Sequence, residues 1–224
     1  TQRLIIYTTQ NTAQSADNPI IDLAHALGDP ALEFRDFEQM IDAAAAKDDR
    51  IVVAKRVDAE KMARAPVLVW RNATRIRLIN AFRKAYDAPE TALLTGEPLI
   101  CDGIELPLKH RKKRIDLEAR GLIKGAQCIY LGPGKKPGFS RLYVSGASDP
   151  QVNVASIIQI EVPDREEPEI ITAARMGAVF LHGAAVTIHK AQGSQWENVI
   201  VWDDGLGRSE LDRRRWLYTA ITRA

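Results

Sequence analysis

The sequence is poor in cysteine and has no long apolar run. Only Cys101 and Cys128 occur among the 224 residues, far apart and without the Cys-x-x-Cys spacing of a metal site. We therefore expect two reduced thiols in a cytoplasmic protein rather than a disulfide framework. No stretch approaches the roughly eighteen uninterrupted apolar residues that a membrane-spanning helix needs, and no signal sequence with a long apolar centre is present. We expect no membrane partner.

The sequence also lacks a strong charge of either sign. Its 31 Lys and Arg and 29 Asp and Glu give a net charge of +2, so a basic surface can only come from local clusters. One cluster is the Lys-His-Arg-Lys-Lys-Arg run at 109–114, which is either a solvated loop or an electrostatic track for DNA whose binding weakens with salt. The Arg triplet at 213–215 has the same two interpretations.

No phosphate loop of the form Gly-x-x-x-x-Gly-Lys-[Ser/Thr] occurs in the sequence. The Gly-Pro-Gly-Lys-Lys stretch at 132–136 lacks both its spacing and its hydroxyl residue. We therefore expect that this chain alone does not hydrolyse ATP. The chain begins with Thr1 rather than methionine and stops at Ala224, directly after a motif-like Thr-Arg segment, which favours a piece of a longer protein.

The apolar pattern of the first hundred residues predicts an α/β sheet. Uninterrupted β-branched runs predict buried strands, and amphipathic stretches between them predict helices, one of which Asn72 can cap. Alternating strands and helices indicate an α/β fold. We expect strands at 4–8, 51–54 and 67–70, and helices at 20–27, 38–47 and after 72.

From residue 99 to about 161 the pattern changes to short apolar runs separated by Gly- and Pro-bearing turns. This pattern predicts a small β-barrel inserted into the α/β domain. The expected boundaries are 1–95 for the first part of the α/β domain, 96–163 for the insert and 164–224 for the last part. Strand-like runs lie at 129–131, 142–144, 157–160, 178–180, 184–187 and 199–202, and a final helix begins near 213.

The first candidate site is the stretch 187–194, which reads Thr-Ile-His-Lys-Ala-Gln-Gly-Ser. Thr187 should stand at the carboxyl end of a strand, where open α/β sheets bind their ligands. Hydroxyls and a glycine permit close approach to a phosphate, and His189 and Lys190 add donors for an anionic backbone. The alternative is that Gly193 and Ser194 form only a turn and that His189 is a core histidine.

The second candidate site is the closing stretch 217–224, which reads Leu-Tyr-Thr-Ala-Ile-Thr-Arg-Ala. Trp216, Ala220 and Ala224 follow helical spacing and should pack one side of a helix. Arg223 would then project from its end, where a guanidinium can stabilise charge on a transferring γ-phosphate. The alternative is a surface arginine that closes the helix, where the helix dipole favours a cation.

Together the two stretches closely resemble motifs V and VI of superfamily 1 helicases, specifically the RecD-like and Dda-like branch that includes the exonuclease V alpha subunits. The stretch 67–72, with Asn80 and Arg83, resembles the strand and helix that open the second RecA-like domain. Residues 121–125 resemble the start of the SH3-like barrel inserted in that domain, and residues 17–21 resemble the segment that precedes it.

This resemblance implies a 5′ to 3′ DNA helicase in which ATP and Mg²⁺ are held between two RecA-like domains while single-stranded DNA crosses both. This chain would supply the second RecA-like domain, an α/β domain with a parallel sheet of the P-loop NTPase type, together with its inserted SH3-like barrel. An N-terminal RecA-like domain of the same protein would supply the phosphate loop. Arg223 would be the arginine finger. The DNA-binding candidates are Thr187, His189, Lys190, Asn72 and Arg75, and the nucleotide-binding candidates are Gln192, Gly193, Ser194, Gln195 and Arg223.

Two residues depart from the family pattern. The family usually has Glu where Gln195 stands, although an amide can still hydrogen-bond a ribose hydroxyl. The family tends to carry an Arg-Gln pair about six residues before the proline that Pro19 matches. The place of that arginine falls here on Ala13, before Gln14. These departures favour an alternative from another class, a non-catalytic nucleic-acid-binding module with a helicase-like fold. An RNA helicase of the same superfamily is a third alternative, because backbone contacts carry no sequence information.

Two further stretches resemble motifs of helicases or of other nucleoside triphosphatases. The Gly-Asp-Pro at 28–30 resembles part of motif III, but no Gln-Leu-Pro follows, so we interpret it as a helix stop. The stretch 199–204 resembles a Walker B strand whose Asp203 and Asp204 could hold Mg²⁺. In the helicase interpretation it is the strand after motif V, both carboxylates lie at a solvated strand end, and no metal is bound. No residue of the sequence suggests a nuclease site.

Overall fold

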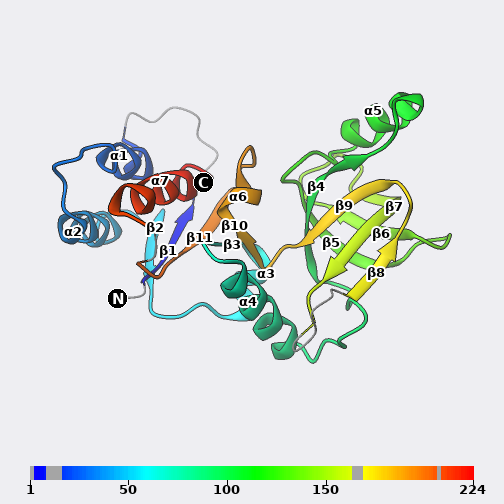
Figure 1. Ribbon diagram of the computed structural model, residues 1–224, viewed down its shortest axis with the longest axis horizontal. Coiled ribbons are helices and arrows are strands. Elements are labelled where there is room, and N and C mark those ends of the chain that lie inside the picture. Colours follow the sequence, from blue (N-terminus) through cyan, green and yellow to red (C-terminus); the bar gives the residue numbers. More distant parts are fainter. Residues whose placement is uncertain (1–2, 9–16, 163–168, 206–207) are drawn as a thin grey trace. The chain divides into compact units, whose positions relative to one another are not determined.

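The computed structural model describes residues 3–8, 17–162, 169–205 and 208–224, and the chain divides into two compact units (Figure 1). Unit 1 combines Thr1–Arg75 with Val186–Ala224, and unit 2 is the continuous stretch Ile76–Ala185. The sequence pattern put the boundaries after residues 95 and 163. The second division of the structure comes later than residue 163 because strands between 169 and 182 pair into the sheet of unit 2.

The sheet of unit 1 has five strands in the order β10-β3-β11-β1-β2. Strands β3 and β11 are parallel, whereas β1 is antiparallel to both β11 and β2. The expectation of a parallel sheet is therefore wrong for this unit, whose sheet is mixed, because an apolar run reveals a strand but not its direction. The strands are β1 (Arg3–Thr8), β2 (Ile51–Ala54), β3 (Val67–Val69), β10 (Ala185–Thr187) and β11 (Asn198–Asp203).

The first helix of unit 1 begins at a side-chain cap and ends just before a glycine. The Asn18 side chain accepts a hydrogen bond from the Ile20 N–H and caps α1 (Pro19–Ala26). That helix ends just before Gly28, as the helix-stop interpretation predicts. Figure 1 shows α1, α2 and α7 gathered beside β1 and β2. The other helices are α2 (Phe34–Ala45), α3 (Ala59–Arg64), α6 (Ile188–Ala191) and α7 (Glu210–Ile221).

Strand position decides which apolar runs of unit 1 are buried. All three residues of β3 are buried, as their β-branched character predicts. The same prediction is wrong for β2, in which Val52 is 44% and Val53 39% exposed. Strand β2 lies at the end of the sheet order, so among the described residues β1 is the one strand beside it.

Unit 2 is built on a six-stranded sheet in the order β6-β5-β4-β9-β7-β8. An additional pairing of β6 with β7 closes a ring through β4, β5, β6, β7 and β9. The predicted strands within residues 129–160 and 178–180 are confirmed, and their inward side chains form one apolar core. The strands are β4 (Pro98–Glu105), β5 (Gln127–Pro133), β6 (Phe139–Val144), β7 (Gln151–Ile160), β8 (Glu169–Ala173) and β9 (Gly177–His182).

Helices in unit 2 were only partly predicted from the sequence. Helix α4 (Asn72–Ala85) begins in unit 1 and continues into unit 2, where Ile79 and Phe82 are buried. The basic run 109–114 forms the 3₁₀ turn η1 (Leu108–His110) and the start of α5 (Arg111–Ala119). The solvated-loop interpretation is therefore wrong about its backbone, because a run of like charges carries no apolar period that would reveal a helix.

The two thiols of unit 2 are buried. Cys101 and Cys128 are free cysteines on the neighbouring strands β4 and β5. Burial raises the pKa of Cys128 to about 12 and also raises that of Cys101, so neither thiol ionises readily near neutral pH. Within the residues that the structure describes, no helix is long and apolar enough to cross a membrane.

A buried network of charges ties α4 to the sheet of unit 2. Arg83 donates from Nε to Glu97 Oε1 at 2.8 Å, and His182 Nε2 lies 3.1 Å from the same oxygen. His182 Nδ1 accepts from the Ala184 N–H, so Nε2 carries the proton and donates to Glu97. Burial raises the pKa of Glu97, but the hydrogen bonds from His182 and Arg83 outweigh it, and the pKa lies below its ordinary value.

We predict that Glu97→Gln lowers the free energy of unfolding of unit 2 by about 3 kcal/mol at neutral pH, because it leaves the buried Arg83 guanidinium without its ion pair. Since the folded-state pKa is depressed, this stabilisation is present above the unfolded value of about 4.3 and is lost as the pH falls through the folded one. Urea titrations followed by far-UV circular dichroism measure the free energy of unfolding. The difference in this free energy between the variant and the wild type should become smaller below about pH 4.

The control for this test is Glu118→Gln, the same change at an exposed position of unit 2. All four tryptophans lie in unit 1, so tryptophan fluorescence should give the same transition for both variants. Equal dichroism transitions for the two variants would show that the Glu97 network does not stabilise unit 2.

Candidate functional site

Three aromatic rings meet where β3 and β10 end. Strand β10 ends at Thr187, as predicted, and β3 is its neighbour in the sheet. Trp70 directly follows β3, and its ring centroid lies 5.5 Å from that of His189 and 6.2 Å from that of Trp216. Trp216 is buried on α7, Trp70 is half-buried and His189 is exposed. The row therefore runs from the core of unit 1 to its surface.

This geometry decides between the two interpretations of His189. The residue is exposed on the short helix α6, so the core-histidine alternative is wrong. Trp70 supports one side of the ring at an interplanar angle of 45°. Thr187 occupies the N-cap position of α6 but its side chain does not cap the helix, and Lys190 is exposed beside His189. Donors suited to an anionic ligand therefore lie together at this end of the sheet.

The residues after α6 form a tight turn. Gly193 has a φ of +81°, in the left-handed region that favours glycine. The Ser194 N–H donates to the Ala191 carbonyl at 3.0 Å and closes the turn, and Ser194 itself is buried. Gln192 and Gln195, on either side of Gly193 and Ser194, are exposed. The stretch is thus a turn, as the alternative supposed, but a turn that presents two amide side chains to solvent.

Arg223 joins the two candidate stretches. Its Nη1 donates to the Ser194 carbonyl at 3.1 Å, and its own carbonyl accepts from the Trp196 N–H at 2.8 Å. Its Nε donates to the Thr219 carbonyl and its Nη2 to Thr222 Oγ1. The side chain is half-buried. Arg223 is therefore held at the end of α7 by residues of both stretches rather than extending freely from the helix.

Asn72 and Arg75 pair with each other at the start of α4. Arg75 Nε donates to Asn72 Oδ1 at 2.8 Å. Asn72 is the first residue of the helix rather than the residue before it, so its side chain orients Arg75 instead of capping α4. The pair follows Trp70 closely in the sequence.

The arginine triplet of α7 serves mainly to hold unit 1 together. Arg213 pairs with Asp203 at 2.9 Å and lies 4.0 Å from the centroid of the Phe34 ring. Arg214 is buried, binds Glu210 at 2.7 Å and donates to the carbonyls of Asp29 and Leu32. The electrostatic-track interpretation is therefore wrong for these two residues. Arg215 is exposed.

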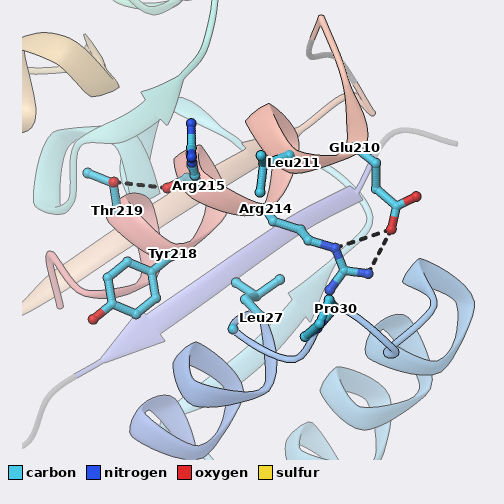
Figure 2. Close-up of a pocket in the computed structure, with 9 residues that line it drawn as sticks. Leu27, Pro30, Glu210, Leu211, Arg214, Arg215, Tyr218 and Thr219 are labelled. Atoms are coloured by element: carbon cyan, nitrogen blue, oxygen red, sulfur yellow. Dashed lines mark hydrogen bonds and ion pairs between the residues drawn. The ribbon is translucent and has the colours of Figure 1, made fainter.

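A cavity of about 580 Å³ lies between this face of α7 and the loop after α1 (Figure 2). Figure 2 shows the Arg214 guanidinium at its edge with both bonds to the Glu210 carboxylate. The lining residues are Leu27, Gly28, Pro30, Glu210, Leu211, Arg214, Arg215, Tyr218 and Thr219.

The carboxylate at the end of β11 is not solvated. Asp203 is 5% exposed and accepts from Arg213 and from the Gly205 N–H. The expectation of a solvated strand end is wrong for Asp203, because α7 returns a guanidinium to it. Among the described residues, no group of three His, Cys, Asp or Glu side chains could hold a metal ion.

Ala13 and Gln14, where one departure from the family pattern falls, lie outside the described residues.

The contact of Trp70 with His189 was missed, because the sequence placed Trp70 only at the end of a buried strand. The sequence does contain a signal for this contact. Trp70 is a large aromatic residue at the carboxyl end of one strand, and that strand lies beside the strand after which the polar turn follows.

The comparison with family models concerns the same part of the chain. Residues 182–224 match the UvrD-like helicase C-terminal domain. The matched segment contains β10, α6, β11 and α7, and therefore both candidate stretches. No curated protein sequence matches the chain.

Solved structures of Pif1 helicases resemble the chain at low sequence identity. The Pif1 helicase from Bacteroides in complex with ADP-AlF3 and single-stranded DNA has a TM-score of 0.48 and 12% identity over 93% of this chain and 47% of its own. Unliganded Pif1 from Bacteroides sp. has a TM-score of 0.47 and 11% identity over 94% of this chain and 48% of its own. The chain thus spans about half the length of these helicases.

We predict that Arg214→Met lowers the free energy of unfolding of unit 1 by about 3 kcal/mol, because it removes a buried guanidinium together with its ion pair to Glu210 and its hydrogen bonds to the α1–α2 loop. Arg215→Met, the same change at the exposed neighbour, should stay within about 0.5 kcal/mol of the wild type. Urea unfolding followed by tryptophan fluorescence measures both. Equal effects of the two changes would contradict the structural role of Arg214.

Proposed function

We propose that this chain is the C-terminal motor half of an ATP-dependent DNA helicase. The observation that carries the proposal is the junction at Arg223, where the ends of the two motif-like stretches are hydrogen-bonded to each other within the segment matched by the UvrD-like helicase model. An element that must respond to both nucleic acid and nucleotide needs such a direct connection between the residues that contact each.

In this proposal Arg223 is an arginine finger for ATP and Mg²⁺ held by an N-terminal RecA-like domain that contains a phosphate loop. Its guanidinium uses three donors on groups of this chain, one each from Nε, Nη1 and Nη2. Each Nη carries a second N–H, which can bind a γ-phosphate oxygen. Gln192, Gly193, Ser194 and Gln195 would lie next to the nucleotide.

Single-stranded DNA is the proposed ligand of the end of the sheet. Thr187, His189 and Lys190 provide a hydroxyl, an imidazole and an ammonium for phosphate oxygens, and Asn72 and Arg75 add donors at the start of α4. Trp70 would keep the His189 ring oriented for such a contact. Backbone contacts of this kind position a strand without reading its sequence.

The finer assignment follows the RecD-like and Dda-like resemblance of the sequence. It makes unit 1 the core of a second RecA-like domain and the ring of strands in unit 2 its SH3-like barrel, a proposal supported by the pairing of β6 with β7. The 5′ to 3′ direction and a cytoplasmic location belong to the same proposal.

A non-catalytic nucleic-acid-binding module is the second candidate function. The observation that favours it is that the Arg223 side chain is already bonded to Ser194, Thr219 and Thr222 of its own chain. The presence of Gln195 where the family usually has Glu agrees with it. The two candidates differ in what Arg223 does when ATP is present.

We predict that Arg223→Ala lowers ATP turnover of the protein that carries a preceding phosphate-loop domain by about 10³-fold or more, as for arginine fingers generally. DNA affinity should change little. The Arg223→Lys variant keeps the charge but not the paired donors and should also be strongly impaired. The control is Arg215→Ala on the exposed side of the same helix. Normal turnover of the Arg223 variants, with folding verified, would exclude the motor and leave the binding module.

We predict that His189→Ala weakens binding of a labelled oligothymidine to this chain by about tenfold or more, because a hydrogen bond to a charged group contributes about 1.5–3 kcal/mol. Fluorescence anisotropy measures the affinity. His25→Ala, at an exposed histidine of α1 in the same unit, is the matched control and should bind as the wild type does. Equal affinities for both variants would remove His189 from the DNA-binding site.

A further inference from the structure

Helix α5 is anchored at one end only. At its C-terminus the Gly121 N–H donates to the Glu118 carbonyl and the Leu122 N–H to the Leu117 carbonyl, with Gly121 at a φ of +91°. This is a Schellman arrangement, and both leucines are buried in the core of unit 2. The C-terminal end of α5 is therefore fixed to the strands beneath it.

The other end of α5 projects from unit 2. No side chain caps its first turn, and six successive residues, 111–116, are exposed. Six successive exposed residues cover the whole circumference of a helix, which has about 3.6 residues per turn, so this end does not lie flat against the protein. Leu108, just before it, is 91% exposed. Figure 1 shows α5 beyond the ends of the strands rather than across the sheet.

The charge at this projecting end opposes helix formation. The first turn of α5 carries four cationic residues and no acidic one, with a further lysine in η1. Cations near a helix N-terminus are unfavourable by about 0.3–1 kcal/mol each, because the helix dipole is positive there. Helix formation alone gives no reason for this group of cations, which we call the α5 cluster. Its members are Lys109, Arg111, Lys112, Lys113 and Arg114.

Only one member of the α5 cluster has a structural role among the described residues. Arg114 donates to the Ile104 carbonyl and lies 3.8 Å from Glu118. No ion pair within the described residues involves the other four members, Lys109, Arg111, Lys112 and Lys113. The acidic residues of α5, Asp116 and Glu118, lie toward its anchored end. The helix is therefore polarised, with its uncompensated positive charge at the exposed tip.

We propose that the α5 cluster is a second nucleic-acid-binding surface, which binds the phosphates on both sides of a groove of double-stranded DNA. A free-standing helix end that carries cations around its circumference fits between two phosphate backbones, since the major groove of about 12 Å admits an α-helix. The phosphates supply the negative charge that the first turn of α5 lacks. The proposal extends the proposed function, in which residues 187–190 bind a single strand, to a duplex bound by unit 2.

Double-stranded DNA explains the α5 cluster better than a small anion does. The cationic side chains leave the helix in several directions, whereas a single phosphate would need donors that converge on one point. A duplex presents phosphates on two strands at regular intervals, and each lysine that neutralises one releases a counterion. Binding through this surface must therefore depend steeply on salt.

The test compares two triple variants with the same change of charge. Lys109→Gln, Lys112→Gln and Lys113→Gln remove three cations from the α5 cluster, and Lys124→Gln, Lys135→Gln and Lys136→Gln remove three exposed lysines elsewhere in unit 2. Affinity for a labelled blunt 20-base-pair DNA duplex is measured by anisotropy over a series of salt concentrations. The slope of log affinity against log salt should flatten by roughly 2–3 for the α5 variant, from about 0.9 per phosphate contact, and stay unchanged for the control.

Each outcome decides the proposal. Equal changes of slope in the two variants would show an effect of net charge alone and would overturn the proposal. An unchanged slope in the α5 variant would also overturn it. The α5 variant should unfold at the same or a higher temperature than the wild type, because it removes repulsion from the helix dipole; a lower one would make the lysines structural and also overturn the proposal. Binding to vesicles of anionic lipid that falls in the α5 variant, without a change on duplex DNA, would assign the cluster to a membrane surface instead.

The failure of this proposal is distinguishable from a failure of the proposed function. The α5 variant should keep its affinity for oligothymidine through His189, and the His189→Ala variant should keep its salt slope on the duplex. Loss of single-strand binding in the His189 variant together with an unchanged duplex slope in the α5 variant would overturn only the second surface.

Discussion

The end of α7 is held by hydrogen bonds that run in both directions between Arg223 and the stretch before β11. Arg223 donates its Nη1 to the Ser194 carbonyl and accepts from the Trp196 N–H on its own carbonyl. Gln195 lies between these two partners and is exposed. A displacement of the turn at Gly193 would therefore be passed to the last residues of α7, and a force on Arg223 to the turn. The positions of Gln192, Gly193, Ser194 and Gln195 depend on this connection, because these residues form the turn that it holds.

Three arginines of the chain illustrate two physical roles. Arg83 and Arg214 are buried, and each binds a carboxylate together with backbone carbonyls of a nearby loop. Such residues specify how a helix meets its neighbours, and their loss leaves uncompensated polar groups. Arg223 is half-buried and retains N–H groups, which suits a ligand. The same residue type thus fixes the architecture at two positions and remains available for chemistry at a third.

Much of the fold could be predicted from the sequence, and the gaps have physical causes. The apolar runs at 4–8, 67–70 and 199–202 revealed strands because burial in the middle of a sheet demands apolar residues. Strand direction could not be derived, so the mixed sheet of unit 1 was missed. The helix after Leu108 was also missed, since its contact with the core rests on Leu117 near its far end. The candidate site was predicted as a set of residues, but the support of His189 by Trp70 depends on two strands being neighbours, which no local pattern encodes.

The exposed valines of β2 bear on how copies of the chain behave in concentrated solution. An edge strand with apolar side chains and unpaired backbone groups is a template for pairing with another molecule. Strand β2 has only four residues, and the exposed cations Lys55 and Arg56 follow it directly. A second strand would gain few hydrogen bonds there and would meet like charge at the end of the pairing. Strand β2 leaves Val52 and Val53 uncovered because it lies at the sheet edge, and its shortness and the cations after it protect that edge against aggregation.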